Sequence, residues 1–341
     1  MAKMKKQNSE SQELVYIHKN SKRLKSIPYP RTLKAGTGKI LAFEMTSTPI
    51  DSPSSLLSSR LQEDGYLLFR GLLNKNNVKK ARTRILKEIN HKNPSTKDLY
   101  PNLLERQDLA RDPCILKILE ADELFQILMK IWFGDQHHDN HHHDSTMTST
   151  ASFVNTSSIT QTQTLQTHQT SKCKYPPPHP KYPMILPIPY KWLRAVPPSL
   201  HTGPHIDRVY LGAGSPSLMT VWIPLGDTPT SLGSLIVCPK SNSSPKFKEL
   251  RDGPYGTSRV GQDGTESGWI CEDPNDIPNI LKLKNPLDLH WVSTDFQMGD
   301  VCFIGMDTLH MSAVNVENEF RISCDTRWMP YGDAYPPWWK N

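Results

Sequence analysis

From residue 182 onward the chain is a series of short apolar stretches separated by Gly and Pro turns, without helical periodicity between them. Successive side chains of such a stretch point to opposite faces, as in a β-strand. Strands joined by turns rather than by helices predict a sandwich or barrel, and a double-layered jelly roll fits. The clearest of these stretches are 191–196, 217–225, 233–239, 296–304 and 321–328.

Helical patterns occur only before these strands. Residues 64–73 read as a turn into a short buried strand, after which Asn77 is a candidate N-cap for an amphipathic helix. A second amphipathic helix is expected to begin at Asp112 and Pro113 and to end at Gly134. We expect both helices to buttress a sheet, so the predicted fold class is mainly β with buttressing helices.

Composition divides the chain into a tail, an arm and one large domain. Residues 1–13 are polar and basic and are expected to be a disordered tail, and 14–60 an N-terminal arm over the core. Residues 61–341 are expected to form a single jelly-roll domain. A low-complexity insertion rich in His, Ser, Thr and Gln interrupts it at about 135–180, and a lid-like excursion at about 240–290.

The net charge of +6 is concentrated before the core, and no basic helix with interleaved aromatic residues follows it. This distribution argues against nucleic-acid binding. Six scattered cysteines indicate reduced thiols, and neither a signal peptide nor an apolar transmembrane run is present. Together with a C-terminus that is not a peroxisomal tripeptide, these features predict a cytoplasmic protein without a membrane partner. The sequence does not indicate an oligomeric state.

Two histidines and an aspartate form the candidate metal site. His205 and Asp207 follow a Gly-Pro turn, and we expect them to share one face of a strand, with His310 brought in from a distant strand. Two imidazoles and one carboxylate cap one face of an octahedral ferrous ion and leave the other face open. A His-x-Asp pair alone is weak, because His137 and Asp139 in the insertion repeat it by chance.

A basic residue completes the pattern. Arg321 follows His310 in an apolar context, where an unpaired charge is costly to bury, and a guanidinium matches a carboxylate bidentately. An organic acid bound beside the metal resolves that cost, and Ser312 can donate a hydroxyl to it. The alternative for Arg321 is an ion pair with a structural Asp or Glu, which is also a possible role of Arg327. The alternative for Ser312 is a solvent-facing position in a loop.

The chain resembles the phytanoyl-CoA dioxygenase family of Fe(II)/2-oxoglutarate-dependent oxygenases over residues 61–133 and 181–330, and especially its uncharacterised members. The resemblance implies a double-stranded β-helix with iron on His205, Asp207 and His310. It implies 2-oxoglutarate chelating that iron, with its far carboxylate on Arg321 and Ser312. Trp222 matches a family tryptophan beside the cosubstrate, an ordinary core tryptophan being the alternative. The motifs that carry the resemblance are 64–72, 191–196, 205–207, 221–225, 299–301, 310–312 and 321–328.

The implied activity consumes O2 and 2-oxoglutarate, releases succinate and hydroxylates a small-molecule substrate. Because Asp207 fills the position that halogenating relatives leave open, hydroxylation is favoured over halogenation, while desaturation and ring closure remain alternatives. A catalytically silent jelly-roll module or sensor that binds metal and 2-oxoglutarate is the second hypothesis. A zinc hydrolase is a third, weaker one, since it gives Arg321 no role. Nothing in the sequence identifies the substrate or shows whether it is a CoA ester.

Overall fold

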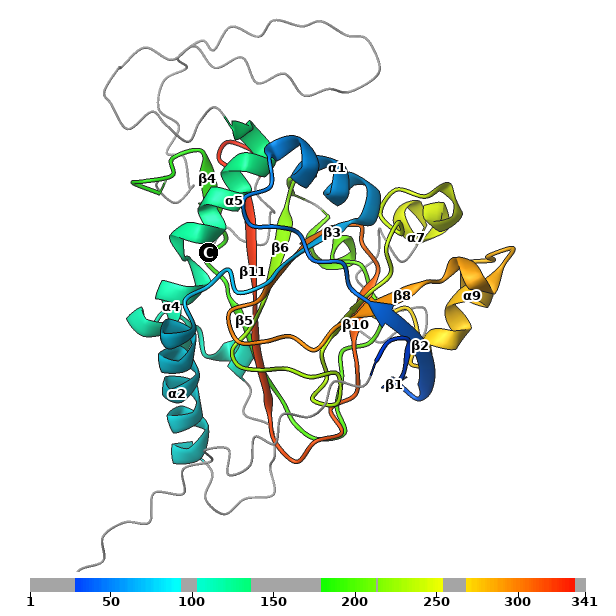
Figure 1. Cartoon of the computed structure of the whole chain (residues 1–341), viewed down its shortest axis with the longest axis horizontal. Coiled ribbons are helices and arrows are strands. Elements are labelled where there is room, and N and C mark those ends of the chain that lie inside the picture. The colour runs from blue at the N-terminus through cyan, green and yellow to red at the C-terminus, as the bar shows by residue number, and fades with distance from the viewer. Residues whose placement is uncertain (1–27, 93–102, 136–178, 213, 254–267, 335–341) are drawn as a thin grey trace, which may run out of the picture.

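The computed structural model describes residues 28–92, 103–135, 179–212, 214–253 and 268–334. Two sheets face each other, and the longer helices cover the outer side of one of them (Figure 1). The five-stranded sheet has the order β1 (Arg31–Ala35), β2 (Gly38–Glu44), β8 (Trp291–Ser293), β7 (Leu235–Val237) and β10 (His310–Ser312). The six-stranded sheet has the order β3 (Tyr66–Phe69), β9 (Val301–Gly305), β6 (Met219–Pro224), β11 (Arg321–Pro330) and β4 (Ile185–Pro187), and β5 (Trp192–Val196) also pairs with β11.

All strand pairs are antiparallel except β2 with β8. This arrangement is the jelly roll that the sequence predicts, so the predicted fold class is confirmed. The longer helices are α1 (Ser54–Asp64), α2 (Lys75–Lys92), α4 (Pro113–Leu119) and α5 (Asp122–Phe133). Short helical turns are η1 (Leu103–Glu105), α3 (Gln107–Ala110), α6 (Arg208–Leu211), η3 (Pro245–Phe247), α7 (Lys248–Asp252), η4 (Pro274–Asp276), α9 (Ile277–Ile280) and η5 (Pro286–Asp288).

The period-two pattern of the strands divides apolar from polar side chains. On β11, Ile322 and Cys324 pack into the large apolar core beneath α2, α4 and α5. On the opposite face of the same strand, Arg321, Asp325 and Arg327 point between the sheets and line a cavity. The helices therefore stabilise the outer face of the six-stranded sheet and leave its inner face for the site.

Two details of the predicted helices are wrong. Helix α2 is capped by Asn74 rather than Asn77, because the Asn74 side chain accepts from the amides of Asn76 and Asn77 at 3.0 and 3.1 Å. The second predicted helix is two helices, α4 and α5. The chain becomes extended at Ala121, and α5 restarts with an acidic first turn, which its N-terminal dipole favours. The predicted start at Asp112 and end at Gly134 are confirmed.

Part of the predicted N-terminal arm belongs to a sheet, since β1 and β2 form a hairpin that pairs with β8. The predicted tail at 1–13, the clustered histidines and nearly all of the low-complexity insertion lie outside the described residues, as does the C-terminal tripeptide. In the ranges that the structure describes, every helix is too short or too polar to span a bilayer.

Candidate metal and cosubstrate site

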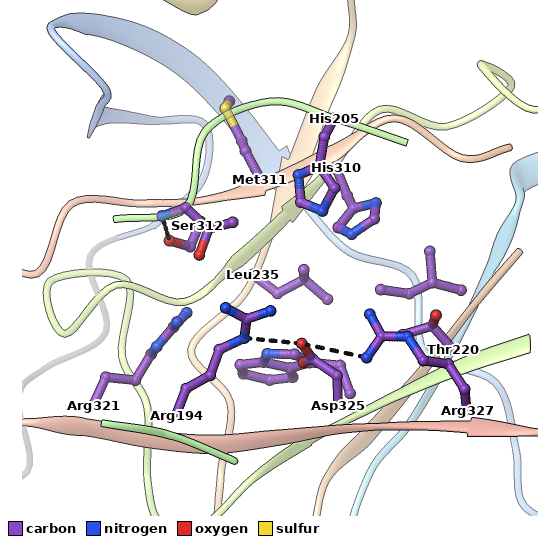
Figure 2. A pocket seen from close by; sticks show the side chains of 13 residues that line it. Arg194, His205, Thr220, Leu235, His310, Met311, Ser312, Arg321, Asp325 and Arg327 are labelled. Carbon is purple, nitrogen blue, oxygen red and sulfur yellow. Dashed lines mark hydrogen bonds and ion pairs between the residues drawn. The ribbon is translucent and has the colours of Figure 1, made fainter. Parts of the chain in front are cut away.

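The two candidate histidine ligands are joined through their backbones. His205 and His310 form an isolated antiparallel bridge, in which each N–H donates to the other residue's carbonyl at 3.0 Å. His310 begins β10, next to β7 in the five-stranded sheet. The two imidazole rings lie side by side, with their centroids 4.2 Å apart and their planes tilted by 54° (Figure 2). The fold thus brings two residues that are remote in sequence into one site.

The aspartate reaches the site from a turn, not from a strand. The expectation that His205 and Asp207 alternate along one strand is wrong, because the chain enters α6 directly after Ile206 and Asp207 is the residue before that helix. Ile206 still packs outward, in the apolar core of the five-stranded sheet. The Asp207 carboxylate lies 3.8 Å from His205 Nε2 and 4.0 Å from His310 Nε2. One ligand atom from each of the three side chains fits within 4.8 Å of the others.

Backbone carbonyls orient both rings. His205 Nδ1 lies 2.8 Å from the Gly203 carbonyl oxygen, and His310 Nδ1 lies 2.9 Å from that of Thr308. A carbonyl can only accept, so each Nδ1 carries a proton and each Nε2 faces Asp207. Burial, followed by the charge of His310, lowers the pKa of His205 to about 3, which keeps its imidazole neutral as metal binding requires.

The carboxylate of Asp207 is fully buried and held by two donors. The Thr220 hydroxyl donates to Oδ2, and Arg327 Nη2 lies 3.4 Å from Oδ1. Burial by itself would raise the pKa of Asp207. The positive charge of Arg327, followed by the two imidazoles and the Thr220 hydrogen bond, outweighs burial and lowers the pKa below its usual range. Asp207 therefore remains anionic, as a carboxylate that binds a metal must be.

The remaining predicted site residues line the adjoining cavity. Arg321 is almost fully buried, and its Nη1 donates to the Gly233 carbonyl at 2.8 Å. Gly233 has a φ of +88°, a conformation that side-chain-bearing residues rarely adopt, so this carbonyl is presented by a glycine turn. Ser312 Oγ accepts from the Thr202 amide at 2.8 Å, which leaves its hydroxyl proton available to a ligand. Trp222 forms part of the wall and packs edge-on against Phe296 at 4.7 Å.

The structure adds polar residues that the sequence analysis did not assign to the site. Arg194 on β5 and Asp325 on β11 face the cavity, joined by an Nε–Oδ2 hydrogen bond of 3.0 Å. Arg327, which the sequence analysis considered only as a structural ion-pair partner, contacts Asp207. Thr220 also contacts Asp207, and Thr202 lines the cavity beside Ser312. The sequence signal that could have identified these residues is the two-residue period of a strand, because polar residues at alternate positions of β5, β6 and β11 share the inner face.

A jelly roll whose inner face gathers two imidazoles, a buried carboxylate and nearby guanidinium groups has the ligand set of non-haem iron oxygenases. Residues 190–323, which run from just before β5 into β11 and contain all of these ligands, match the family model of phytanoyl-CoA dioxygenase (PhyH). The part of the chain that carries the site is therefore similar to the phytanoyl-CoA dioxygenase family.

Solved structures show the same fold. The epimerase SnoN, in complex with Fe3+, alpha ketoglutarate and nogalamycin RO, is 14% identical, with 83% of this chain and 86% of that chain covered and a TM-score of 0.51. The non-haem alpha ketoglutarate-dependent carbocyclase SnoK from nogalamycin biosynthesis is 17% identical, with 86% and 90% covered and a TM-score of 0.51. No curated protein sequence gave a match.

Proposed function

We propose that this protein is an Fe(II)/2-oxoglutarate-dependent dioxygenase that hydroxylates a small molecule. The observation that carries the proposal is the convergence of His205, Asp207 and His310, whose ligand atoms lie within 4.8 Å of one another inside the jelly roll. The donor set fits ferrous iron, because it offers two imidazole nitrogens and one anionic oxygen. Bound iron supplies the activation of O2, with substrate, O2 and 2-oxoglutarate yielding hydroxylated substrate, succinate and CO2.

The protein's own contribution begins with the orientation of the ligands. The carbonyls of Gly203 and Thr308 hold the two rings with Nε2 facing inward. Thr220 and Arg327 fix the carboxylate of Asp207 by one hydrogen bond to each oxygen. Such outer contacts set ligand orientation and basicity, so metal affinity depends on them as well as on the ligands themselves.

Arg321 and Ser312 are proposed to hold the far carboxylate of 2-oxoglutarate. Arg321 lies at the start of β11 below Ser312, on the same side of the cavity (Figure 2). The Gly233 carbonyl anchors one terminal nitrogen of the guanidinium, and the Ser312 hydroxyl has a proton to donate. A carboxylate placed between them gains charge-assisted hydrogen bonds in a buried setting, where such bonds are strong. Trp222 is proposed to line the same subsite.

A small-molecule substrate is supported by the polar and charged side chains, Arg194 and Asp325 among them, that line the cavity beside the candidate ligands. The similar structure of SnoN was obtained with a small molecule, nogalamycin RO. The buried, anionic Asp207 supports hydroxylation over halogenation, because it occupies a coordination position on the metal.

The direct test is metal binding followed by turnover. We expect wild-type protein to bind Ni(II) stoichiometrically in calorimetry and to form succinate from 2-oxoglutarate after anaerobic loading with Fe(II) and exposure to O2, even without substrate. His205→Ala, Asp207→Ala and His310→Ala should each abolish both signals. His290→Ala is the matched control, because His290 is exposed and outside the cavity. Unchanged succinate formation in the ligand variants would refute the metal assignment.

Product analysis separates the enzyme from the silent binding module. Mass spectrometry of reactions with a metabolite panel should reveal a product heavier by one oxygen atom, labelled from 18O2. Metal and 2-oxoglutarate binding without any succinate formation would instead support the binding module. A product lighter by two hydrogens would indicate desaturation or ring closure at the same site.

A further inference from the structure

We propose that Arg194 forms an oxyanion subsite for the substrate, so that the substrate is a small organic molecule bearing a carboxylate or phosphate group. This inference rests on the proposed function and specifies its substrate class. It begins from the register of β5 against β11, in which Arg194 pairs with Ser323. The neighbours of Arg194 on β5, Leu193 and Ala195, are buried in the core beneath the helices, so Arg194 points the other way, into the cavity.

The guanidinium is anchored at one edge and open at the other. Asp325 Oδ2 accepts from Arg194 Nε at 3.0 Å, and the side chain keeps 26% of its surface accessible. Within the described ranges, neither Nη1 nor Nη2 of Arg194 forms a hydrogen bond or ion pair. Figure 2 shows the Arg194 guanidinium raised from β5 toward the level of Ser312 and the imidazoles. The side chain is thus already oriented, with its terminal nitrogens directed at the space above it.

The positive charge of the Arg194 guanidinium is not balanced by the other charged groups around the cavity. Arg321 is assigned to one carboxylate of the 2-oxoglutarate dianion, and a divalent metal would offset the other carboxylate together with the negative charge of Asp207. Arg327 contacts Asp207 at 3.4 Å and also lies 3.9 Å from Asp325. Asp325 is therefore shared by two guanidinium groups, Arg194 and Arg327. A neutral ligand would bury Arg194 without full compensation, whereas an oxyanion on its terminal nitrogens restores neutrality.

The geometry also keeps the other cavity arginines away from this role. Arg327 is stacked on the Trp192 ring, with its guanidinium carbon 3.8 Å from the ring centroid, which fixes its plane beside Asp207. Arg321 is tied to Gly233 at the far end of the inner face. Arg194 lies between them (Figure 2), below the rings of His205 and His310. An anion on Arg194 would place the adjoining part of the substrate toward the proposed metal.

The test compares charged and neutral probes of one shape on protein loaded with Zn(II) and saturated with 2-oxoglutarate. Hexanoate, hexyl phosphate and hexanamide are titrated by ligand-observed NMR, for which zinc is suitably diamagnetic. Wild-type protein should bind at least one anionic probe about ten-fold more tightly than hexanamide, as expected for charge-assisted hydrogen bonds. The stronger of the two anions shows whether the subsite is built for carboxylate or for phosphate.

Arg194→Gln should abolish this preference for anions while changing the 2-oxoglutarate affinity, measured by calorimetry, by less than about two-fold. Arg194→Lys, which keeps a cation beside Asp325 but loses the planar fork, should weaken the anionic probes and leave hexanamide unchanged, and it serves if the Gln variant does not fold. Arg111→Gln is the control, since Arg111 is exposed and outside the cavity.

Three results would overturn the proposal. Equal binding of charged and neutral probes by wild-type protein removes the anion subsite, and so does an undiminished preference in Arg194→Gln. A loss of 2-oxoglutarate affinity of about ten-fold in that variant assigns Arg194 to the cosubstrate instead. Failure of wild-type protein to bind zinc and 2-oxoglutarate is a different result, because it refutes the proposed function on which the subsite depends.

Discussion

His205 and His310 hold each other in place through a reciprocal pair of backbone hydrogen bonds, each 3.0 Å long. Their side chains therefore project from adjacent points of one bridge, and the distance between the rings is set by strand pairing rather than by flexible loops. A site built on paired backbones keeps its geometry without a ligand, which is what a metal centre with few protein ligands needs. The following predictions test how the surrounding residues use that arrangement.

Thr220→Val should weaken metal binding. The Thr220 hydroxyl donates to Asp207 Oδ2, and Val retains the shape of Thr without the donor. Loss of an outer hydrogen bond to a ligand typically reduces metal affinity about ten-fold or more. We expect this loss in Ni(II) calorimetry, whereas Thr220→Ser should remain near wild type. Equal affinity in the Val and Ser variants would contradict the proposed orientation of Asp207.

Arg321→Ala should raise the apparent KM for 2-oxoglutarate by about ten-fold or more, because a charge-assisted pair to the far carboxylate is lost. The affinity for metal alone should be unaffected, since Arg321 contacts none of the three candidate ligands in the described structure. Succinate formation across a range of 2-oxoglutarate concentrations measures the change. An unaltered KM would remove Arg321 as the anchor and favour a purely structural role beside Gly233.

The metal-free protein should lose stability on acidification. The pKa of His205 falls from 6.5 to about 3 on folding, so between these values the unfolded chain binds a proton that the native chain does not. Above about pH 6.5 this difference in pKa costs no stability, and between about pH 6.5 and 3 the native state loses stability as the pH falls, by at most about 1.4 kcal/mol per pH unit. Urea unfolding at neutral pH and at about pH 5 measures it. His205→Gln should show a shallower pH dependence, and an identical slope would exclude His205 as the source.

Gly203→Ala should destabilise the turn that precedes His205. A Cβ on Gly203 would lie 2.5 Å from ring atoms of Trp269, too close for any contact, and overpacking of this kind costs about 1–3 kcal/mol. Gly71→Ala is the control that separates steric overlap from backbone strain. Gly71 has a φ of +63°, but no atom lies within 4 Å of the position that an added Cβ would take. We expect Gly203→Ala also to weaken Ni(II) binding, since the Gly203 carbonyl orients the His205 ring, while Gly71→Ala should not. Equal metal affinity in both variants would contradict this link.

The local alternation of apolar and polar residues was sufficient to predict the jelly-roll architecture. The alternation on β11, with Ile322 and Cys324 on one face and Arg321 and Asp325 on the other, is legible in the sequence and corresponds to the core and the cavity. The family motif around His205 and His310 could also be recognised in the sequence, and residues 190–323 match the model of that family. The roles of the individual site residues stay predictions until the variants are measured.

Errors occurred where local pattern competes with tertiary packing. The His-x-Asp spacing suggested a strand, but the chain turns into α6 after Ile206. The Asp207 side chain is held in the site by hydrogen bonds that Thr220 and Arg327 donate to its carboxylate. The helical periodicity over 113–133 gave no sign of the break at Ala121. In both places the backbone conformation depends on contacts with residues distant in the sequence, and a local periodicity carries no information about those contacts.

The sequence by itself determined the strand alternation, the buttressing helices and the residue types of the candidate centre, because these follow from side-chain period and chemistry at short range. Only the tertiary structure decided that His205 forms a backbone bridge with His310. It also decided that Arg194 and Asp325, which are hydrogen-bonded to each other, lie between Arg321 and Arg327. The physical reason is that strand register is fixed by pairing across the sheet, and the partner of a strand is not encoded within the strand itself.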